Sequence, residues 1–160
     1  MTVLAFYVRG LPKAQPRPRA FARKMGGKVV ARVFEAGTAE AWKADVIRCG
    51  EPHRPESPIE GPVSVEIDFM LPRPKRLMRR KDPDGVMWAT CKPDVDNLSK
   101  AVLDALTTDG WWRDDAQVVE STTRKVYHAK DGTPGALVCI EQIESGGVTR
   151  PREAAPALSG

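Results

Sequence analysis

Two aspartates, Asp94 and Asp96, stand one residue apart before an amphipathic stretch, and Lys100 lies four residues after the second of them. A further acid, Asp115, follows a Gly-Trp-Trp sequence at 110–112. Carboxylates held close together repel one another unless a cation is present, and Mg²⁺ prefers oxygen ligands. The sequence therefore predicts a divalent-metal site formed by Asp94, Asp96 and Asp115.

Such a site is suited to phosphodiester hydrolysis, because the metal polarises a phosphoryl oxygen and acidifies a bound water. A nearby ammonium can stabilise the charge that develops on the phosphate. Lys100 is a candidate for that ammonium, but its spacing from Asp96, taken alone, favours an ordinary intrahelical ion pair. Asp94 or Asp96 could equally cap the helix, since acids favour helix N-termini.

Other uses of an Asp-x-Asp pair fit this sequence less well. A calcium loop of the EF-hand type requires an oxygen ligand where Leu98 stands and glycine where Ser99 stands. An aspartate phosphotransferase or a sugar-nucleotide enzyme presents the pair after an apolar strand, which residues 89–93 do not resemble. Asp104 is expected to be a solvated or ion-paired helix residue, and Asp114 either a turn residue or an acid just outside the metal site.

The composition is that of a small globular protein with a basic balance. The 160 residues carry a net charge of +4, and 41% are hydrophobic. We expect one domain over residues 1–144 and a disordered tail over 145–160, which is rich in small residues and proline. The positive charge modestly favours nucleic acid as a partner. The scattered cysteines make a zinc site improbable and favour a reducing cytoplasm, and no segment is long and apolar enough to span a membrane.

Hydrophobic periodicity and turn residues locate the elements that would carry this site. Strands are predicted at 3–9, 28–34, 63–71, 118–128 and 136–143, and helices at 39–48 and from 94–96 to 107. Proline-rich connectors separate them. At least one of Trp111 and Trp112 is expected in the core, the alternative being stacking on DNA bases.

Two basic loops flank the acidic stretch. Residues 9–32 contain no acid among many cations, and residues 72–84 form a second basic loop that leads directly to the acidic stretch. A solvated loop usually mixes charges of both signs, and residues 9–32 do not, so this loop is predicted to contact phosphate. The acidic stretch lies between the two loops, which could hold the phosphate backbones. The predicted DNA-contacting cations are Arg17, Arg19, Arg73, Lys75, Arg76, Arg79, Arg80, Lys81 and Lys92.

Three motifs together resemble the RusA family of Holliday-junction resolvases. They are Lys-Pro-Asp-x-Asp-Asn-Leu-x-Lys at 92–100, Asp-Ala-Leu at 104–106, and Trp-x-Asp-Asp-Ala-Gln-Val at 112–118. The resemblance is tight over residues 92–119 and weaker outside. It is far more specific than an Asp-x-Asp pair.

The resemblance implies a small α+β fold, with a mixed β-sheet and two main helices packed on it, acting as a homodimer. It also implies Mg²⁺-dependent paired nicking of four-way DNA junctions, with Mn²⁺ as a possible substitute metal. By matching position, Asp94, Asp96 and Asp115 would be the metal-site acids and Lys100 an essential lysine. A bacterial cytoplasm and a phage or prophage origin are implied as well.

Two other functions are compatible with the sequence. One is a non-catalytic protein that binds branched DNA, which the intact acids and Lys100 argue against. The other is a nuclease that acts on other branched or flapped DNA. The longer basic loop at 73–81 and the tail after Ser145 depart from the family pattern, and they bear on substrate preference rather than on chemistry.

Overall fold

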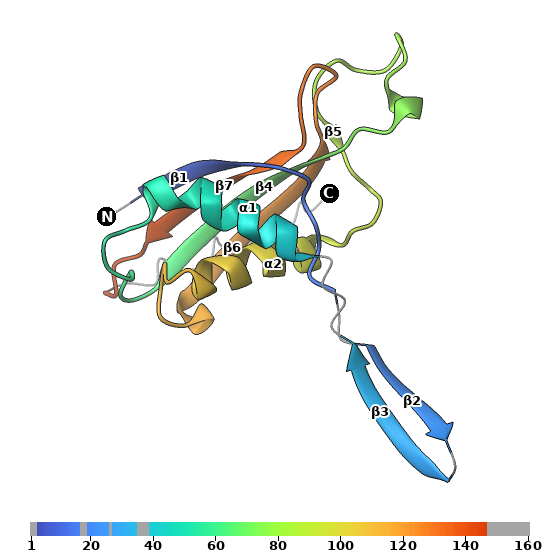
Figure 1. Ribbon diagram of the computed structural model, residues 1–160. Coiled ribbons are helices and arrows are strands. Elements are labelled where there is room, and N and C mark those ends of the chain that lie inside the picture. Colours follow the sequence, from blue (N-terminus) through green and yellow to red (C-terminus); the bar gives the residue numbers. More distant parts are fainter. Residues whose placement is uncertain (1–2, 17–18, 26, 35–38, 147–160) are drawn as a thin grey trace, which may run out of the picture.

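The computed structural model describes residues 3–16, 19–25, 27–34 and 39–146. It is an α+β fold in which a five-stranded mixed sheet is covered on one face by two helices (Figure 1). The sheet has the order β1-β7-β4-β6-β5, with bounds β1 Val3–Arg9, β7 Gly135–Gln142, β4 Val63–Leu71, β6 Val118–Tyr127 and β5 Met87–Trp88. This confirms the predicted fold class.

The central strand β4 has the alternation that the sequence predicted. Val63, Val65, Ile67, Phe69 and Leu71 are buried and face the helices, while the intervening side chains lie on the other face. Strand β4 pairs in parallel with β6 and antiparallel with β7. The parallel pairing requires a long crossover, and helix α2 lies within it.

Helix α2, Val95–Thr108, and helix α1, Glu40–Gly50, provide the other half of the core. Helix α2 buries Leu98, Val102 and Leu106, which recur every four residues. Trp111 and Trp112 are at most 1% exposed, so both belong to the core, and the alternative of base stacking by these two residues does not hold. Burial of this apolar stripe fixes where the polar residues of α2 project.

Several elements lie outside the strands and helices that the sequence predicted. Strand β2 Arg19–Met25 is one of them, and it forms a hairpin with the predicted strand β3 Lys28–Phe34 that extends away from the rest of the molecule (Figure 1). Short 3₁₀ helices occur at η2 Glu51–His53, η3 Lys75–Leu77 and η4 Asp115–Gln117. Strand β5 is also additional, because a two-residue strand gives no periodic signal.

Some predictions fall on parts of the chain that the structure does not describe. Arg17 and nearly all of the predicted tail, residues 147–160, lie outside the described residues. Arg19 begins strand β2. Within the described residues, no helix has the length and apolar character needed to cross a membrane.

Candidate active site

Helix α2 presents its polar residues over a pocket that it shares with strand β6. Asp96 and Lys100 belong to the first half of the helix, where they flank the nearly buried Ser99. The Lys100 Nζ atom lies 3.4 Å from Asp104 Oδ1. Lys100 therefore forms an intrahelical ion pair with Asp104, which also bears out the expectation that Asp104 is an ion-paired helix residue.

Asp115 reaches this pocket from a different element, the short helix η4. The Asp114 carboxylate caps that helix by accepting from the Ala116 N–H at 2.8 Å, which settles its role as a turn residue. The Gln117 amide completes the cap, since its Oε1 accepts from the N–H groups of Arg113 and Asp114. Its Nε2 donates at 2.9 Å to the carbonyls of residues 59 and 61.

Gln117 is thus a positioning residue that the sequence reasoning missed. It fixes η4 to the chain entering β4 and so sets where Asp115 points. The signal was present in the spacing, because an Asp followed three residues later by Gln is a capping-box pattern.

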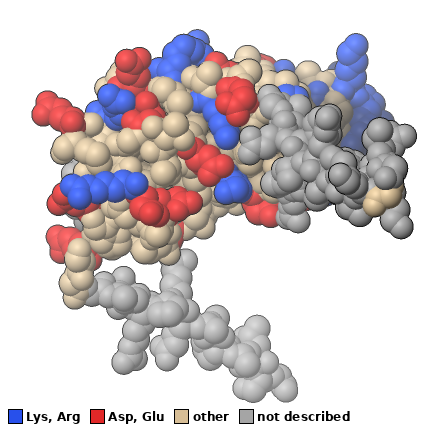
Figure 2. Space-filling view, turned by 60° about the horizontal axis from the view of Figure 1, so that its bottom comes forward, with Lys and Arg blue, Asp and Glu red and all other residues tan. Residues whose placement is uncertain are grey.

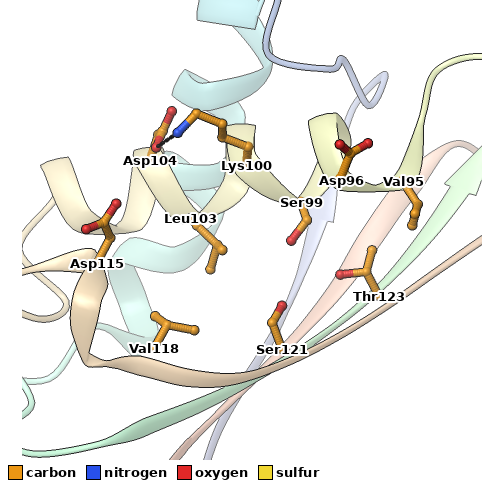
Figure 3. A pocket seen from close by; sticks show the side chains of 10 residues that line it. All are labelled: Val95, Asp96, Ser99, Lys100, Leu103, Asp104, Asp115, Val118, Ser121 and Thr123. Atoms are coloured by element: carbon orange, nitrogen blue, oxygen red, sulfur yellow. Dashed lines mark hydrogen bonds and ion pairs between the residues drawn. The ribbon is translucent and has the colours of Figure 1, made fainter.

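The resulting pocket, which we call the acid-lined pocket, has a volume of about 510 Å³. Figure 3 shows Asp96 and Asp115 toward opposite ends of it, with Lys100 turned toward Asp104 and small hydroxyl side chains below the helix. Its lining residues are Val95, Asp96, Ser99, Lys100, Leu103, Asp104, Asp115, Val118, Ser121 and Thr123. The structure thereby brings together three of the four residues predicted for catalysis.

The fourth, Asp94, occupies the N-cap position of α2 and does not line the acid-lined pocket. Its carboxylate accepts from Lys92 Nζ at 2.8 and 2.7 Å. Lys92 is 83% exposed at the side chain, so the pair lies at the surface. Asp94 therefore stands beside the acid-lined pocket, and Lys92, predicted to contact DNA, is close to it.

The chain that enters α2 is fastened to strand β6. Lys125 Nζ donates to the carbonyls of Cys91 and Pro93, the latter at 2.8 Å. Cys91 Sγ lies 2.9 Å from the Tyr127 hydroxyl, and this contact, with burial, raises the pKa of Tyr127. Lys125 therefore fixes the chain at two residues shortly before Asp94.

The donor set of the acid-lined pocket suits a hard divalent cation. Mg²⁺ usually takes one or two carboxylates and completes its shell with water and substrate phosphate, so Asp96 and Asp115 are chemically appropriate ligands. Among the described residues, no group of three or more His, Cys, Asp or Glu side chains is arranged to hold a metal ion.

Arg73 differs from the other cations of the second basic loop. It is 7% exposed, and its guanidinium donates at 2.9 and 2.8 Å to the carbonyls of Leu77 and Gly85 and also to that of Pro83. This burial does not fit the predicted direct contact with DNA. The guanidinium satisfies carbonyls that a proline-rich loop leaves without helix or sheet partners, so Arg73 organises the loop.

Further polar contacts hold the same loop. Lys130 Nζ donates to the Asp82 carbonyl at 2.7 Å and lies 3.0 Å from Asp84. The Arg79 side chain donates to Asp82, and this hydrogen bond lowers the pKa of Asp82. We call residues 72–93 the basic platform. The remaining predicted cations, Lys75, Arg76, Arg79, Arg80 and Lys81, are carried on it.

Charge of both signs is spread over the surface. Figure 2 shows acidic and basic side chains interspersed on one face of the molecule. On the sheet face that the helices leave uncovered, Arg124 is paired with both Glu66 and Asp68. These two acids therefore lie away from the acid-lined pocket, and net charge alone does not mark a surface for DNA.

Comparison with known proteins shows similarity to one family. The family described as "Endodeoxyribonuclease RusA" matches residues 10–141. The "Uncharacterized protein YqaN" of Bacillus subtilis (strain 168) is 38% identical over 150 residues, which are 91% of this chain and 100% of that protein. The "Crossover junction endodeoxyribonuclease RusA" of Escherichia coli (strain K12) and its namesake in Enterobacteria phage 82 are each 30% identical over 101 residues, 63% of this chain and 71% of each relative.

Proposed function

The chain belongs to the RusA endodeoxyribonuclease family and is a nuclease, and from that premise we propose that it resolves four-way DNA junctions in a metal-dependent reaction. The observation that carries this proposal is the acid-lined pocket. Asp96 and Asp115 come from separate elements, yet they line the same pocket as Lys100. The matched relatives whose names state an activity are crossover-junction endodeoxyribonucleases.

In this proposal Asp96 and Asp115, toward opposite ends of the acid-lined pocket, would supply carboxylate ligands for Mg²⁺ or Mn²⁺, and Asp94 would support the same site from the helix N-cap. The bound ion would supply Lewis acidity toward the phosphoryl oxygen and a more acidic water. Lys100 offers an ammonium on the rim of the acid-lined pocket, where it can stabilise negative charge on the phosphate. Burial of the apolar stripe of α2 keeps Asp96 and Lys100 in place, and the Gln117 cap keeps Asp115 in place.

The basic platform would position the DNA beside the acid-lined pocket. Its cations are suited to phosphate, which fixes the orientation of a duplex without reading its sequence. Paired nicks on opposing strands call for two active sites, so we include a homodimer in the proposal. A single protomer carries one acid-lined pocket of this composition among its described residues.

The test is cleavage of a synthetic mobile four-way junction, with and without Mg²⁺, beside a linear duplex of the same sequence. Symmetric nicks on the junction alone, dependent on Mg²⁺, support the proposal. Binding without cleavage would indicate a junction-binding protein without activity. Equal cutting of the linear duplex, or preferential cutting of flapped DNA, would replace the junction with another substrate.

A further inference from the structure

The four tryptophans of the chain differ sharply in exposure. Trp42, Trp111 and Trp112 are at most 1% exposed, whereas Trp88 is 71% exposed. Trp88 belongs to β5, the edge strand that pairs with the end of β6 and forms part of the basic platform. A large indole held in water forgoes burial that would stabilise the fold, so its location requires an explanation.

The exposure of Trp88 does not reflect a loose backbone. Trp88 pairs with Val126, and the residues on either side of it are also held. The Ala89 N–H donates to the Lys125 carbonyl at 3.3 Å, and Arg73 Nη2 donates to Met87 Sδ at 3.1 Å. The indole is therefore presented from a fixed backbone.

The basic platform that carries Trp88 combines positively charged side chains with exposed apolar ones. Met78 and Val86, on the same platform, are 42% and 60% exposed. Basic side chains interleaved with apolar and aromatic ones are the composition of surfaces that bind unpaired or unstacked nucleic acid. Trp88 also precedes Asp94 by six residues, which span at most about 20 Å when extended, so one DNA junction can reach both.

We propose that Trp88 stacks on a nucleobase that is exposed where the arms of branched DNA meet. This inference rests on the proposed function, which it deepens by naming the residue that senses the branch. A continuous duplex stacks its bases on one another, whereas a branch point leaves base faces available to an aromatic ring. The platform cations would hold the flanking phosphates while the indole covers the exposed base.

A second copy of the chain is the other occupant that an exposed indole could have. In a two-fold symmetric contact through this patch, the same surface would meet itself. The cations of one platform would then approach those of the other, and like charges disfavour that contact. The charge of the platform thus favours DNA over self-association through Trp88.

The first measurement is iodide quenching of the intrinsic tryptophan fluorescence of the full chain, in EDTA so that DNA is not cut. Because the other three tryptophans are buried, the iodide-accessible emission is expected to come from Trp88 and to vanish in Trp88→Phe. Adding four-way junction should either shield this emission from iodide or quench it directly through stacking of the indole on a base. A sealed duplex of equal length should leave most of it accessible. Unchanged accessibility with saturating junction would overturn the proposal.

The second measurement compares the affinity of variants for a labelled junction and for the sealed duplex. Trp88→Ala should weaken junction binding by roughly tenfold or more, which corresponds to the loss of one stacked base. Trp88→Phe keeps a ring and should recover most of that loss, and duplex binding should be nearly unchanged in both. Val3→Ala is the matched control, because Val3 is 62% exposed on the opposite edge strand of the sheet.

The remaining outcomes separate this inference from the proposed function. If Trp88→Ala and the unmodified chain bind the junction with equal affinity, the stacking role is overturned. A change in the sedimentation mass of Trp88→Ala would also overturn it, because the indole would then belong to a protein contact. A failure of the proposed function shows instead in the unmodified chain, as an absence of preference for junction over duplex. Protection of Trp88 by a single-stranded oligonucleotide would then still support base stacking.

Discussion

The acid-lined pocket and the basic platform are adjacent in sequence but are held together by different forces. Helix α2 carries Asp96 and Lys100 on the polar side of a helix whose other side is buried with 0% exposure at Leu98, Val102 and Leu106. The loop of the platform is held largely by Arg73 and Lys130, which donate to main-chain carbonyls. One region is positioned by core burial and the other by buried or half-buried cations.

This difference indicates a division of labour. A surface residue of α2 can change without loss of the fold, because the apolar stripe fixes the helix. The platform can change in length or conformation without disturbing the core, but each of its few polar contacts matters to its shape. Variants of the acid-lined pocket should therefore affect cleavage, and variants of the platform should affect recognition of DNA.

The largest effect is expected for Asp96→Asn. The substitution removes a carboxylate charge from the acid-lined pocket and should lower the cleavage rate by roughly 10²–10³-fold or more. Junction binding should be retained or tightened, because a repulsive charge near phosphate is lost. Cleavage under single-turnover conditions and gel-shift affinity measure the two separately. A normal cleavage rate would refute Asp96 as a metal ligand.

Lys125→Met should lower the cleavage rate at saturating protein by roughly 10–100-fold, which is typical for a residue that orients a metal ligand. Methionine keeps the length of the side chain but cannot donate to the carbonyls of Cys91 and Pro93. Junction affinity should change little, while the half-saturating concentration of Mg²⁺ should rise. Lys130→Met is the matched control, because Lys130 also donates to a carbonyl, that of Asp82, and should leave the rate unchanged.

Arg73→Met should weaken junction binding by roughly tenfold and leave the single-turnover cleavage rate near normal. The substitution leaves the Leu77 and Gly85 carbonyls without their charged donor, and hydrogen bonds to charged groups contribute about 1.5–3 kcal/mol. Trypsin should then cut faster within residues 75–81. If both the affinity and the trypsin cleavage rate stay unchanged, Arg73 does not hold the platform.

The smallest effect is expected for Arg80→Ala, an exposed cation of the platform. Junction affinity should fall modestly. In a plot of the logarithm of the binding constant against the logarithm of salt concentration, the steepness of the slope should decrease by about one for the lost phosphate contact. Arg48→Ala removes an exposed arginine of helix α1 and should leave the slope unchanged. Equal slopes for Arg80→Ala and the unmodified chain would exclude Arg80 from phosphate contact.

The sequence was sufficient where periodicity was strong. The alternation of β4 and the four-residue recurrence in α2 predicted the elements that position Asp96 and Lys100, and the motif at 112–118 predicted that Asp115 joins them. At least one of Trp111 and Trp112 was predicted to lie in the core, and the structure buries both.

The sequence was insufficient where structure depends on long-range polar contacts. The residues next to Arg73 in the sequence do not distinguish it from Arg76. In the fold, Arg73 is buried and donates to carbonyls of its own loop, whereas Arg76 is exposed. The cluster of basic residues therefore included one cation, Arg73, that the structure buries. The exposure of Trp88 was equally hidden, because it follows from a two-residue strand at the sheet edge.

The division between the acid-lined pocket and the basic platform can be tested by one paired measurement. Dissociation constants for a four-way junction and single-turnover cleavage rates at saturating protein are determined for Asp96→Asn and Arg73→Met. The account predicts that Asp96→Asn binds but does not cut, and that Arg73→Met binds weakly but cuts at nearly the normal rate once bound. A parallel fall of affinity and rate in both variants would contradict it.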